Sequence, residues 1–274
     1  MLPSTPFAVS IKMVDKMKNI FRISITTILV LLFAISIQSC KEKPIDEVGV
    51  RYEGFHEKQS DEEFGNFRQI TTTGMGSSLY RSASPIYFGE GRGYYALKAY
   101  KEHNITAIIN FADTEESLKN QDLYKGSYYS KQNILCNYIR VGGADASNKE
   151  YYSPEFKERM KDLAYFIVSN PGEKYAIHCT IGRDRTGFSC AILEALMGAT
   201  LLEIQEDYAL SYENLEDYPH NYPRSMENVK TMLINAFECP DIENADLKAE
   251  AYEYFVQCRV EKEAIDKLIE ILSK

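Results

Sequence analysis

The sequence predicts an α/β fold with a single, mostly parallel sheet flanked by helices. Short apolar runs rich in β-branched residues alternate with segments whose apolar residues recur at helical spacing. Strands arranged in this way pair in parallel and are covered by helices on both faces. The composition, 45% hydrophobic and 26% charged, is that of a globular chain, and 274 residues suffice for one well-packed domain and a leader.

The first predicted helix and strands lie between residues 94 and 141. A short helix is expected over residues 94–100, ending near His103, and a strand over the apolar residues 105–109. A second strand is predicted over residues 137–141, where a pair of glycines follows.

The best-marked helix begins after Ser153. This serine is a suitable N-cap, Pro154 occupies the first helical position, and Glu155 lies in the first turn. Asparagine, proline and glycine at residues 170–172 end the helix. The remaining expected elements are a strand over residues 175–177, an apolar helix over 186–197 that ends at Gly198, and further helices over 201–208, 226–237 and 247–272.

The amino-terminal segment has the pattern of a secretory signal. Residues 23–37 form an almost unbroken apolar run that follows Lys18 and Arg22 and is short for a stable membrane span. The run stops just before Ser39 and Cys40, and this arrangement resembles a bacterial lipobox, in which the cysteine receives a lipid. The alternative is an uncleaved membrane anchor in which Cys40 has no role.

The chain is therefore expected to have three parts. Residues 1–39 form the signal peptide, residues 40–65 a lipidated cysteine and a charged tether, and residues 66–274 the folded domain with its C-terminal helices. Both interpretations of the leader place the domain outside the cytoplasm. By resemblance, Lys41 after the cysteine indicates lipid anchoring at a bacterial outer membrane, on its periplasmic or surface face.

The charge and the cysteines exclude several classes of function. The net charge is -9, and because residues 1–39 carry +3, the rest of the chain carries -12. Such an acidic body is a poor nucleic-acid binder, so a phosphorylated substrate needs a local positive site. The cysteines include no CxxC pair, so neither a zinc site nor a disulfide scaffold is predicted, and no cofactor or metal is expected.

The residues that indicate chemistry form the run His178-Cys179-Thr180-Ile181-Gly182-Arg183-Asp184-Arg185-Thr186-Gly187. Because it follows a strand and opens a helix, Cys179 is expected at the carboxyl edge of the sheet, where such folds bind ligands. A loop of this length can turn its backbone N–H groups inward and form an anion nest, closed by the helix N-terminus. The same positive field stabilises a thiolate, which is the nucleophilic form of cysteine.

Each loop residue has an expected role. Gly182 allows the backbone to turn closely under the phosphate, and Arg185 offers a planar fork that matches two phosphoryl oxygens. His178 is expected to orient the loop, and Thr186 to donate its hydroxyl to the departing thiolate. The predicted phosphate-binding residues are Thr180, Ile181, Gly182, Arg183, Asp184 and Arg185.

The run resembles the signature of the protein tyrosine phosphatase superfamily, a His-Cys pair followed after five residues by Arg and then Thr or Ser. This variant of the signature, with an aspartate directly before the arginine, resembles that of the bacterial tyrosine/serine phosphatase family, which also accepts phosphoinositides. Residues 66–68, 79–82 and 207–211 match that family in order. The resemblance implies a cysteine-phosphatase fold and a phosphocysteine intermediate. The chain departs from the family at two places. Residues 110–112 are Asn-Phe-Ala where the family often has Asp-Leu-Arg, and Arg183 stands where the family often has Lys.

Three aspartates are candidates for the general acid that protonates the leaving oxygen. Asp184 lies inside the loop, where the resemblance to myotubularin-like lipid phosphatases implies such an acid. Asp145 follows a predicted strand, at the place where dual-specificity enzymes carry their acid on a mobile loop. Asp113 follows the strand over residues 105–109.

Three functions from different classes remain open at the level of sequence. The first is a phosphomonoesterase that acts on phosphorylated proteins, or on phosphoinositides or inositol phosphates, near the membrane to which the lipid would anchor it. The second is a non-catalytic phosphate-binding module, which the presence of both Cys179 and Arg185 disfavours. The third is a rhodanese-like sulfurtransferase, whose active loop is usually shorter. The second loop charge, Arg183, favours multiply phosphorylated lipids or inositols.

Overall fold

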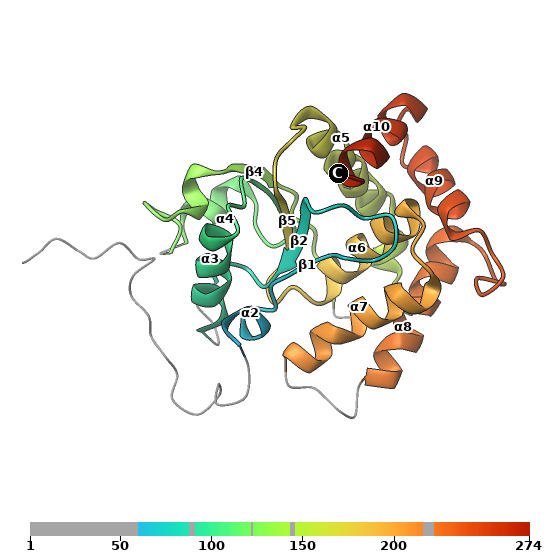
Figure 1. Cartoon of the computed structure of the whole chain (residues 1–274), viewed down its shortest axis with the longest axis horizontal. Coiled ribbons are helices and arrows are strands. Elements are labelled where there is room, and N and C mark those ends of the chain that lie inside the picture. The colour runs from blue at the N-terminus through green and yellow to red at the C-terminus, as the bar shows by residue number, and fades with distance from the viewer. Residues whose placement is uncertain (1–59, 88–90, 122, 143–145, 216–221) are drawn as a thin grey trace, which may run out of the picture. The chain divides into compact units, whose positions relative to one another are not determined.

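A five-stranded sheet in the order β1-β2-β5-β3-β4 forms the centre of the domain in the computed structural model (Figure 1). The structure describes residues 60–87, 91–121, 123–142, 146–215 and 222–274. Pairing is parallel throughout except between β1 and β2. The strands are β1 (Arg68–Gln69), β2 (Leu79–Ser82), β3 (Ala107–Asn110), β4 (Asn133–Cys136) and β5 (Tyr175–His178).

Helices cover both faces of the sheet, so the predicted fold class is confirmed. In Figure 1, α3 and α4 lie on one side of the strands, and α5, α6 and the later helices lie on the other. The helices are α2 (Asp61–Phe64), α3 (Arg92–Glu102), α4 (Glu115–Lys119), α5 (Pro154–Ser169), α6 (Asp184–Met197), α7 (Leu201–Asn214), α8 (Tyr222–Phe237), α9 (Leu247–Gln257) and α10 (Lys262–Leu272), and short 3-10 turns occupy Tyr129–Lys131 and Lys149–Tyr152.

The two cores follow from the alternation of side chains along the strands. Ile109 and Ile177 pack with the large cluster formed by α5 to α10, whereas Ile108 and Ala176 pack on the opposite face against α3 and its neighbours. Both faces of the central strands are buried, as expected for a parallel sheet covered on both sides.

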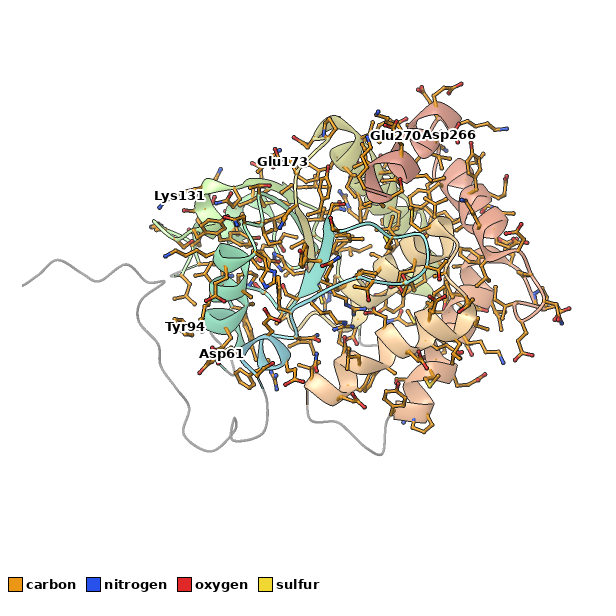
Figure 2. The ribbon with its side chains drawn as sticks, in the orientation of Figure 1. Asp61, Tyr94, Lys131, Glu173, Asp266 and Glu270 are labelled. Atoms are coloured by element: carbon orange, nitrogen blue, oxygen red, sulfur yellow. The ribbon has the colours of Figure 1, made fainter. Side chains whose placement is uncertain are left out.

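Charged side chains project outward from this body. Figure 2 labels Asp61, Lys131, Glu173 and Glu270, each of which lies at the periphery of the drawn molecule.

Among the described residues, none of the helices has the length and apolar character that crossing a bilayer requires. The predicted signal peptide and lipidated cysteine fall outside the described residues.

The predicted start of α5 is confirmed in detail. Ser153 Oγ accepts a hydrogen bond from Phe156 N at 3.2 Å, with Pro154 at the first helical position. This cap satisfies one of the orphan N–H groups of the first turn.

The strand predicted over residues 137–141 is wrong. Strand β4 comes earlier, at Asn133–Cys136, where it pairs with β3. Beyond β4 the chain stays close to the end of β3, because Asn137 N donates to Asn110 O at 2.8 Å, but it forms no regular ladder. One carbonyl of this segment, Ile139 O, instead accepts a hydrogen bond from Arg185 Nη1 at 3.0 Å.

The single helix predicted over residues 247–272 is also wrong, because it is broken into α9 and α10. Arg259 adopts the left-handed conformation with φ 63°, and Val260 N donates back to Phe255 O at 3.0 Å. This is the geometry of a helix C-terminus. Arginine instead of glycine occupies the left-handed position, so the sequence gives no stop signal there.

Candidate active site

Cys179 directly follows β5, the central strand, so it lies at the carboxyl edge of the sheet, and α6 begins five residues later at Asp184. The connecting loop turns sharply at Gly182, whose φ is +74°. A Cβ at this position would lie 2.1 Å from Ser82 O, so only glycine fits against β2. The predicted strand-loop-helix context of the cysteine is confirmed.

The carbonyl groups of the loop are all held by donors. The five bonds run from His178 Nδ1 to Cys179 O (3.1 Å), from Ser84 N to Thr180 O (3.0 Å), from Asn66 Nδ2 to Ile181 O (3.0 Å), from Arg81 Nη2 to Gly182 O (3.0 Å) and from Gly187 N to Arg183 O (2.8 Å). By contrast, the N–H groups of Ile181 and Gly182 meet no acceptor in the described part of the chain. Unpaired amides in a tight loop before a helix N-terminus form a site for an anion.

Arg185 is fixed and still has donors to offer. Its Nη1 donates to Phe111 O at 2.7 Å and to Ile139 O at 3.0 Å, and its Nη2 donates to Thr180 Oγ1 at 3.0 Å. A guanidinium carries five N–H groups, so one on Nε and one on Nη2 remain for two oxygens of a phosphoryl group.

Arg183 and Asp184 form an ion pair at the mouth of the loop. Arg183 Nε donates to Asp184 Oδ1 at 2.7 Å, and the two side chains are 21% and 18% exposed. The Arg183 guanidinium also lies 4.9 Å from the ring centroid of Tyr212. The second loop charge is therefore partly neutralised by its neighbour.

His178 lies behind the nucleophile. It is fully buried, and burial lowers its pKa to about 4 although the hydrogen bond to Cys179 O opposes this shift. The imidazole is therefore neutral at pH 7; Nδ1 donates to Cys179 O, and Nε2 accepts from the Tyr129 hydroxyl at 2.8 Å. A neutral histidine with a hydrogen bond at each ring nitrogen can hold the loop in place; its predicted role in orienting the loop stays a prediction.

Thr186 and Cys190 occupy the first turns of α6. Thr186 Oγ1 is buried and has no hydrogen-bond partner among the described residues, so its hydroxyl can donate a hydrogen bond to an anion in the loop. Burial raises the pKa of the Cys190 thiol well above its ordinary value, which makes this cysteine unreactive.

The candidate acids differ in their surroundings. Asp113 is buried and accepts hydrogen bonds from three side chains, which hold it as a structural acceptor: Asn110 Nδ2 at 3.2 Å, Ser117 Oγ at 3.3 Å and Gln121 Nε2 at 3.2 Å. Asp184 lies in the loop itself. Asp145 is outside the described residues, although the following residue, Ala146, is anchored by Asn228 on α8 at 2.8 Å.

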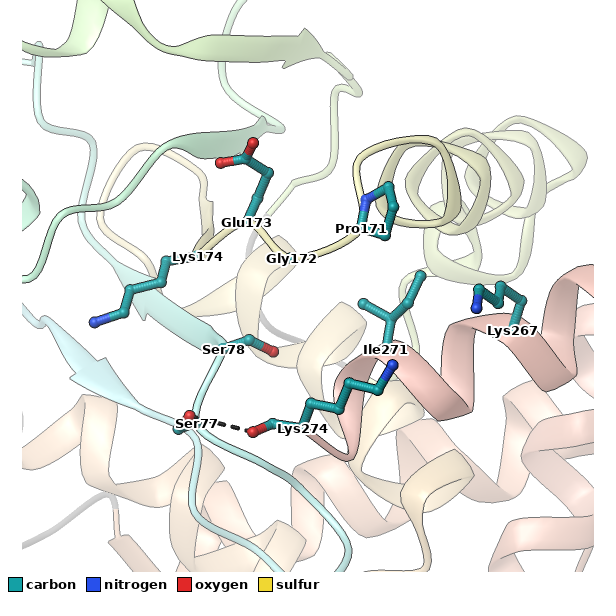
Figure 3. A pocket seen from close by; sticks show the side chains of 9 residues that line it. All are labelled: Ser77, Ser78, Pro171, Gly172, Glu173, Lys174, Lys267, Ile271 and Lys274. Atoms are coloured by element: carbon teal, nitrogen blue, oxygen red, sulfur yellow. Dashed lines mark hydrogen bonds between the residues drawn. The ribbon is translucent and has the colours of Figure 1, made fainter.

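A hollow lies at the amino edge of the sheet, opposite the loop (Figure 3). It adjoins the starts of β2 and β5 at Ser78 and Lys174, so it is remote from Cys179. Its lysines 267 and 274 both pair with Glu270, which offsets part of their charge. This hollow plays no part in the site.

The comparison with known families decides the class. A family profile described as a tyrosine phosphatase family matches residues 76–274. The chain belongs to the tyrosine phosphatase family. No curated protein matches it. Membership supports a phosphatase function, that is, a hydrolase that removes phosphate. In the described part of this phosphatase, no group of His, Cys, Asp and Glu side chains could hold a metal ion.

The sequence did not assign roles to several residues that support the phosphatase loop. Asn66, Arg81 and Asp207 lie in the segments that carry the resemblance to the bacterial family, yet the nearest of them to Cys179 in sequence is 28 positions away. The matching order of those segments was the only sequence signal that could have pointed to these residues. Asn66 and Arg81 contact the loop directly and Asp207 contacts Arg81, and these contacts appear only in the fold.

Proposed function

We propose that this chain is a cysteine-dependent phosphomonoesterase in which Cys179 is the nucleophile and Arg185 binds the phosphoryl group. The observation that carries the proposal is the loop itself. It holds Cys179, unpaired amides and the two remaining donors of Arg185 at one end of the central strand. The family match is consistent with this chemistry.

The reaction is a double displacement. The Cys179 thiolate attacks phosphorus, an S–P bond forms, and the P–O bond to the leaving group breaks as an aspartic acid donates its proton to the departing oxygen. Water then attacks phosphorus, gives its proton to the same carboxylate and releases inorganic phosphate and the thiolate. Thr186 would donate its hydroxyl to that thiolate. The loop amides and Arg185 would stabilise the anionic transition state.

Asp184 is the acid we propose first, and Asp145 is the second candidate. Asp184 belongs to the loop that would bind the phosphate, and its partial exposure leaves it accessible to a leaving group. Asp113 is disfavoured, because it is buried and three side-chain donors already occupy its carboxylate.

The proposed substrates are phosphotyrosine or phosphoserine in proteins, or phosphoinositides and inositol phosphates. Arg183 adds positive charge at the loop mouth and favours the multiply phosphorylated ligands, whereas its pairing with Asp184 weakens that preference.

The test is phosphate release by the purified full chain under reducing conditions, first with a small aryl phosphate and then with phosphopeptides and phosphoinositides. We expect Cys179→Ser to abolish release and Cys239→Ser, a half-buried cysteine outside the site, to retain it. Release that survives Cys179→Ser would contradict the mechanism. Phosphate binding without release would indicate a non-catalytic phosphate-binding module.

We further propose that the protein is exported and anchored to a bacterial membrane through a lipid on Cys40. The support is the apolar run that stops just before this cysteine. In a bacterial host supplied with labelled fatty acid, the Cys40→Ser variant should carry no label, and the variant protein should leave the membrane fraction. Unchanged labelling of the variant would overturn this proposal.

A further inference from the structure

A buried ionic cluster lies directly behind the loop. Asp207 on α7 pairs with Arg68 of β1 through Nε at 2.7 Å and with Nη1 of Arg81 of β2. The Arg81 side chain is 0% exposed. Ser211, one turn along α7, accepts from Nη2 of both arginines at 3.1 Å. The cluster therefore ties two strands to α7.

Two chains of hydrogen bonds lead from the cluster to the loop. Arg81 Nη2 donates to Gly182 O at 3.0 Å. Arg68 Nη1 donates to Asn66 Oδ1 at 2.9 Å, and Asn66 Nδ2 in turn donates to Ile181 O at 3.0 Å. Two consecutive carbonyls of the loop are thus held by side chains that lie far from it in sequence.

The direction of these bonds matters because a trans peptide is planar. A carbonyl and the N–H group of the following residue point in opposite directions. Holding Ile181 O and Gly182 O toward the cluster therefore turns the N–H groups of Gly182 and Arg183 away from it, toward the space in front of the loop. The backbone of Gly182, which has no side chain, could easily adopt other conformations without this restraint.

We propose that Arg81 and Asn66 are positioning residues that aim the loop amides at the phosphoryl group, with Asp207 and Arg68 as the buried ion pairs that fix them. This inference rests on the proposed phosphate site but assigns the orientation of its amides to residues outside the signature. Its consequence is that the affinity for the anion depends on β1, β2 and α7.

The electrostatics of the cluster agree with this role. Burial raises the pKa of Asp207, but Arg68 and Arg81 outweigh burial and hold that pKa well below its usual range. Burial, reinforced by Asp207, raises the pKa of the neighbouring Glu194 well above its usual value, which favours the neutral carboxyl. Two arginines face one carboxylate, and the net positive charge behind the loop favours an anion in front of it.

The decisive variant is Asn66→Asp in the full chain. Asparagine and aspartate have the same shape and both tolerate the left-handed backbone of residue 66, with φ 47°, but aspartate cannot donate to Ile181 O. Asn104→Asp is the control for the backbone conformation, because Asn104 is also left-handed, with φ 56°, and precedes β3 at the edge of the sheet opposite the loop; unlike Asn66, it is exposed.

Arg81→Lys forms the second pair. Lysine keeps the charge but loses the fork that joins Asp207 to Gly182 O. Its control is Arg92→Lys, since Arg92 is buried and donates to the carbonyls of Phe64 and Asn214 rather than to the loop.

The measurement is the concentration of inorganic phosphate that half-protects Cys179 from alkylation by iodoacetamide, read by mass spectrometry, together with the thermal midpoint. We expect Asn66→Asp and Arg81→Lys to raise that concentration roughly tenfold or more, and the controls to leave it unchanged. If Arg81→Lys does not fold, Asn66→Asp decides the question alone.

A purely structural role would lower the thermal midpoint and leave phosphate protection unchanged, and that result in folded Asn66→Asp would overturn the inference. If phosphate protects Cys179 equally well in the wild-type chain and in both variants, this inference is wrong but the proposed function stands. A wild-type chain that phosphate does not protect and that releases no phosphate would sink the proposed function itself.

Discussion

At the scale of single residues, Arg185 shows how one side chain can be both rigid and available. Three of its five N–H groups are engaged by Phe111 O, Ile139 O and Thr180 Oγ1, and these bonds leave the guanidinium one orientation. In the proposed mechanism, the two remaining N–H groups would therefore bind a phosphoryl group with little further loss of side-chain entropy. A lysine at this position could not meet both requirements.

The choice between Asp184 and Asp145 is also a question of single residues. If Asp184 is the acid, Asp184→Asn should slow hydrolysis of phosphates with poor leaving groups by about 10²–10⁴-fold, because only those need a proton. Substrates with good leaving groups should be affected much less. The measurement is kcat/KM across a series of aryl and alkyl phosphates.

Asp145→Asn is the matched variant for this series. It should retain the wild-type dependence on the leaving group. The reverse pattern would assign the acid to Asp145, and an unchanged dependence in both variants would show that neither aspartate donates the proton.

At the scale of elements, α6 combines the proposed anion site at its start with a buried acid further along. The first turn contains Asp184 and Thr186, and Glu194 lies more than two turns later, against the Asp207 cluster. Burial first and the Asp207 charge second raise the pKa of Glu194 well above its ordinary value of 4.5. The folded chain therefore releases the Glu194 proton at a higher pH than the unfolded chain does.

This linkage gives a pH-dependent prediction. Because the folded pKa is raised, the stability that Glu194 contributes is present below about pH 4.5 and is lost as the pH rises above it. Glu194→Gln removes the titration and keeps the shape. The free energy of unfolding of the variant relative to wild type should therefore increase from pH 5 to pH 8, measured by urea denaturation. An equal difference at both pH values would show that Glu194 is ionised in the fold.

At the scale of the whole molecule, the sequence predicted the part of the site that is local. The unit from β5 through the loop to α6 could be predicted because its strand, its glycine and its helix start are contiguous. The sheet class followed from the alternation of strands and helices. Ser153 likewise marked α5 through a cap that depends only on its immediate neighbours.

The remaining features depend on contacts that are distant in sequence. Strand β2 reads as a mixed polar segment, and only the fold shows that the charged Arg81 is buried against Asp207. The break at Arg259 was hidden because the apolar residues on either side continue a helical pattern. The segment 137–141, whose Ile139 O accepts from Arg185, resembled a strand because local composition does not reveal where strand pairing stops.

The central claim is that phosphate transfer passes through Cys179, and the most direct measurement is to trap the intermediate. Wild-type protein mixed with an aryl phosphate and rapidly denatured should carry a phosphoryl group on the peptide that contains Cys179. The same peptide from Cys179→Ser, and the peptide that contains Cys239, should carry none. Turnover by wild type with no phosphoryl group on Cys179, together with undiminished turnover by Cys179→Ser, would contradict the account.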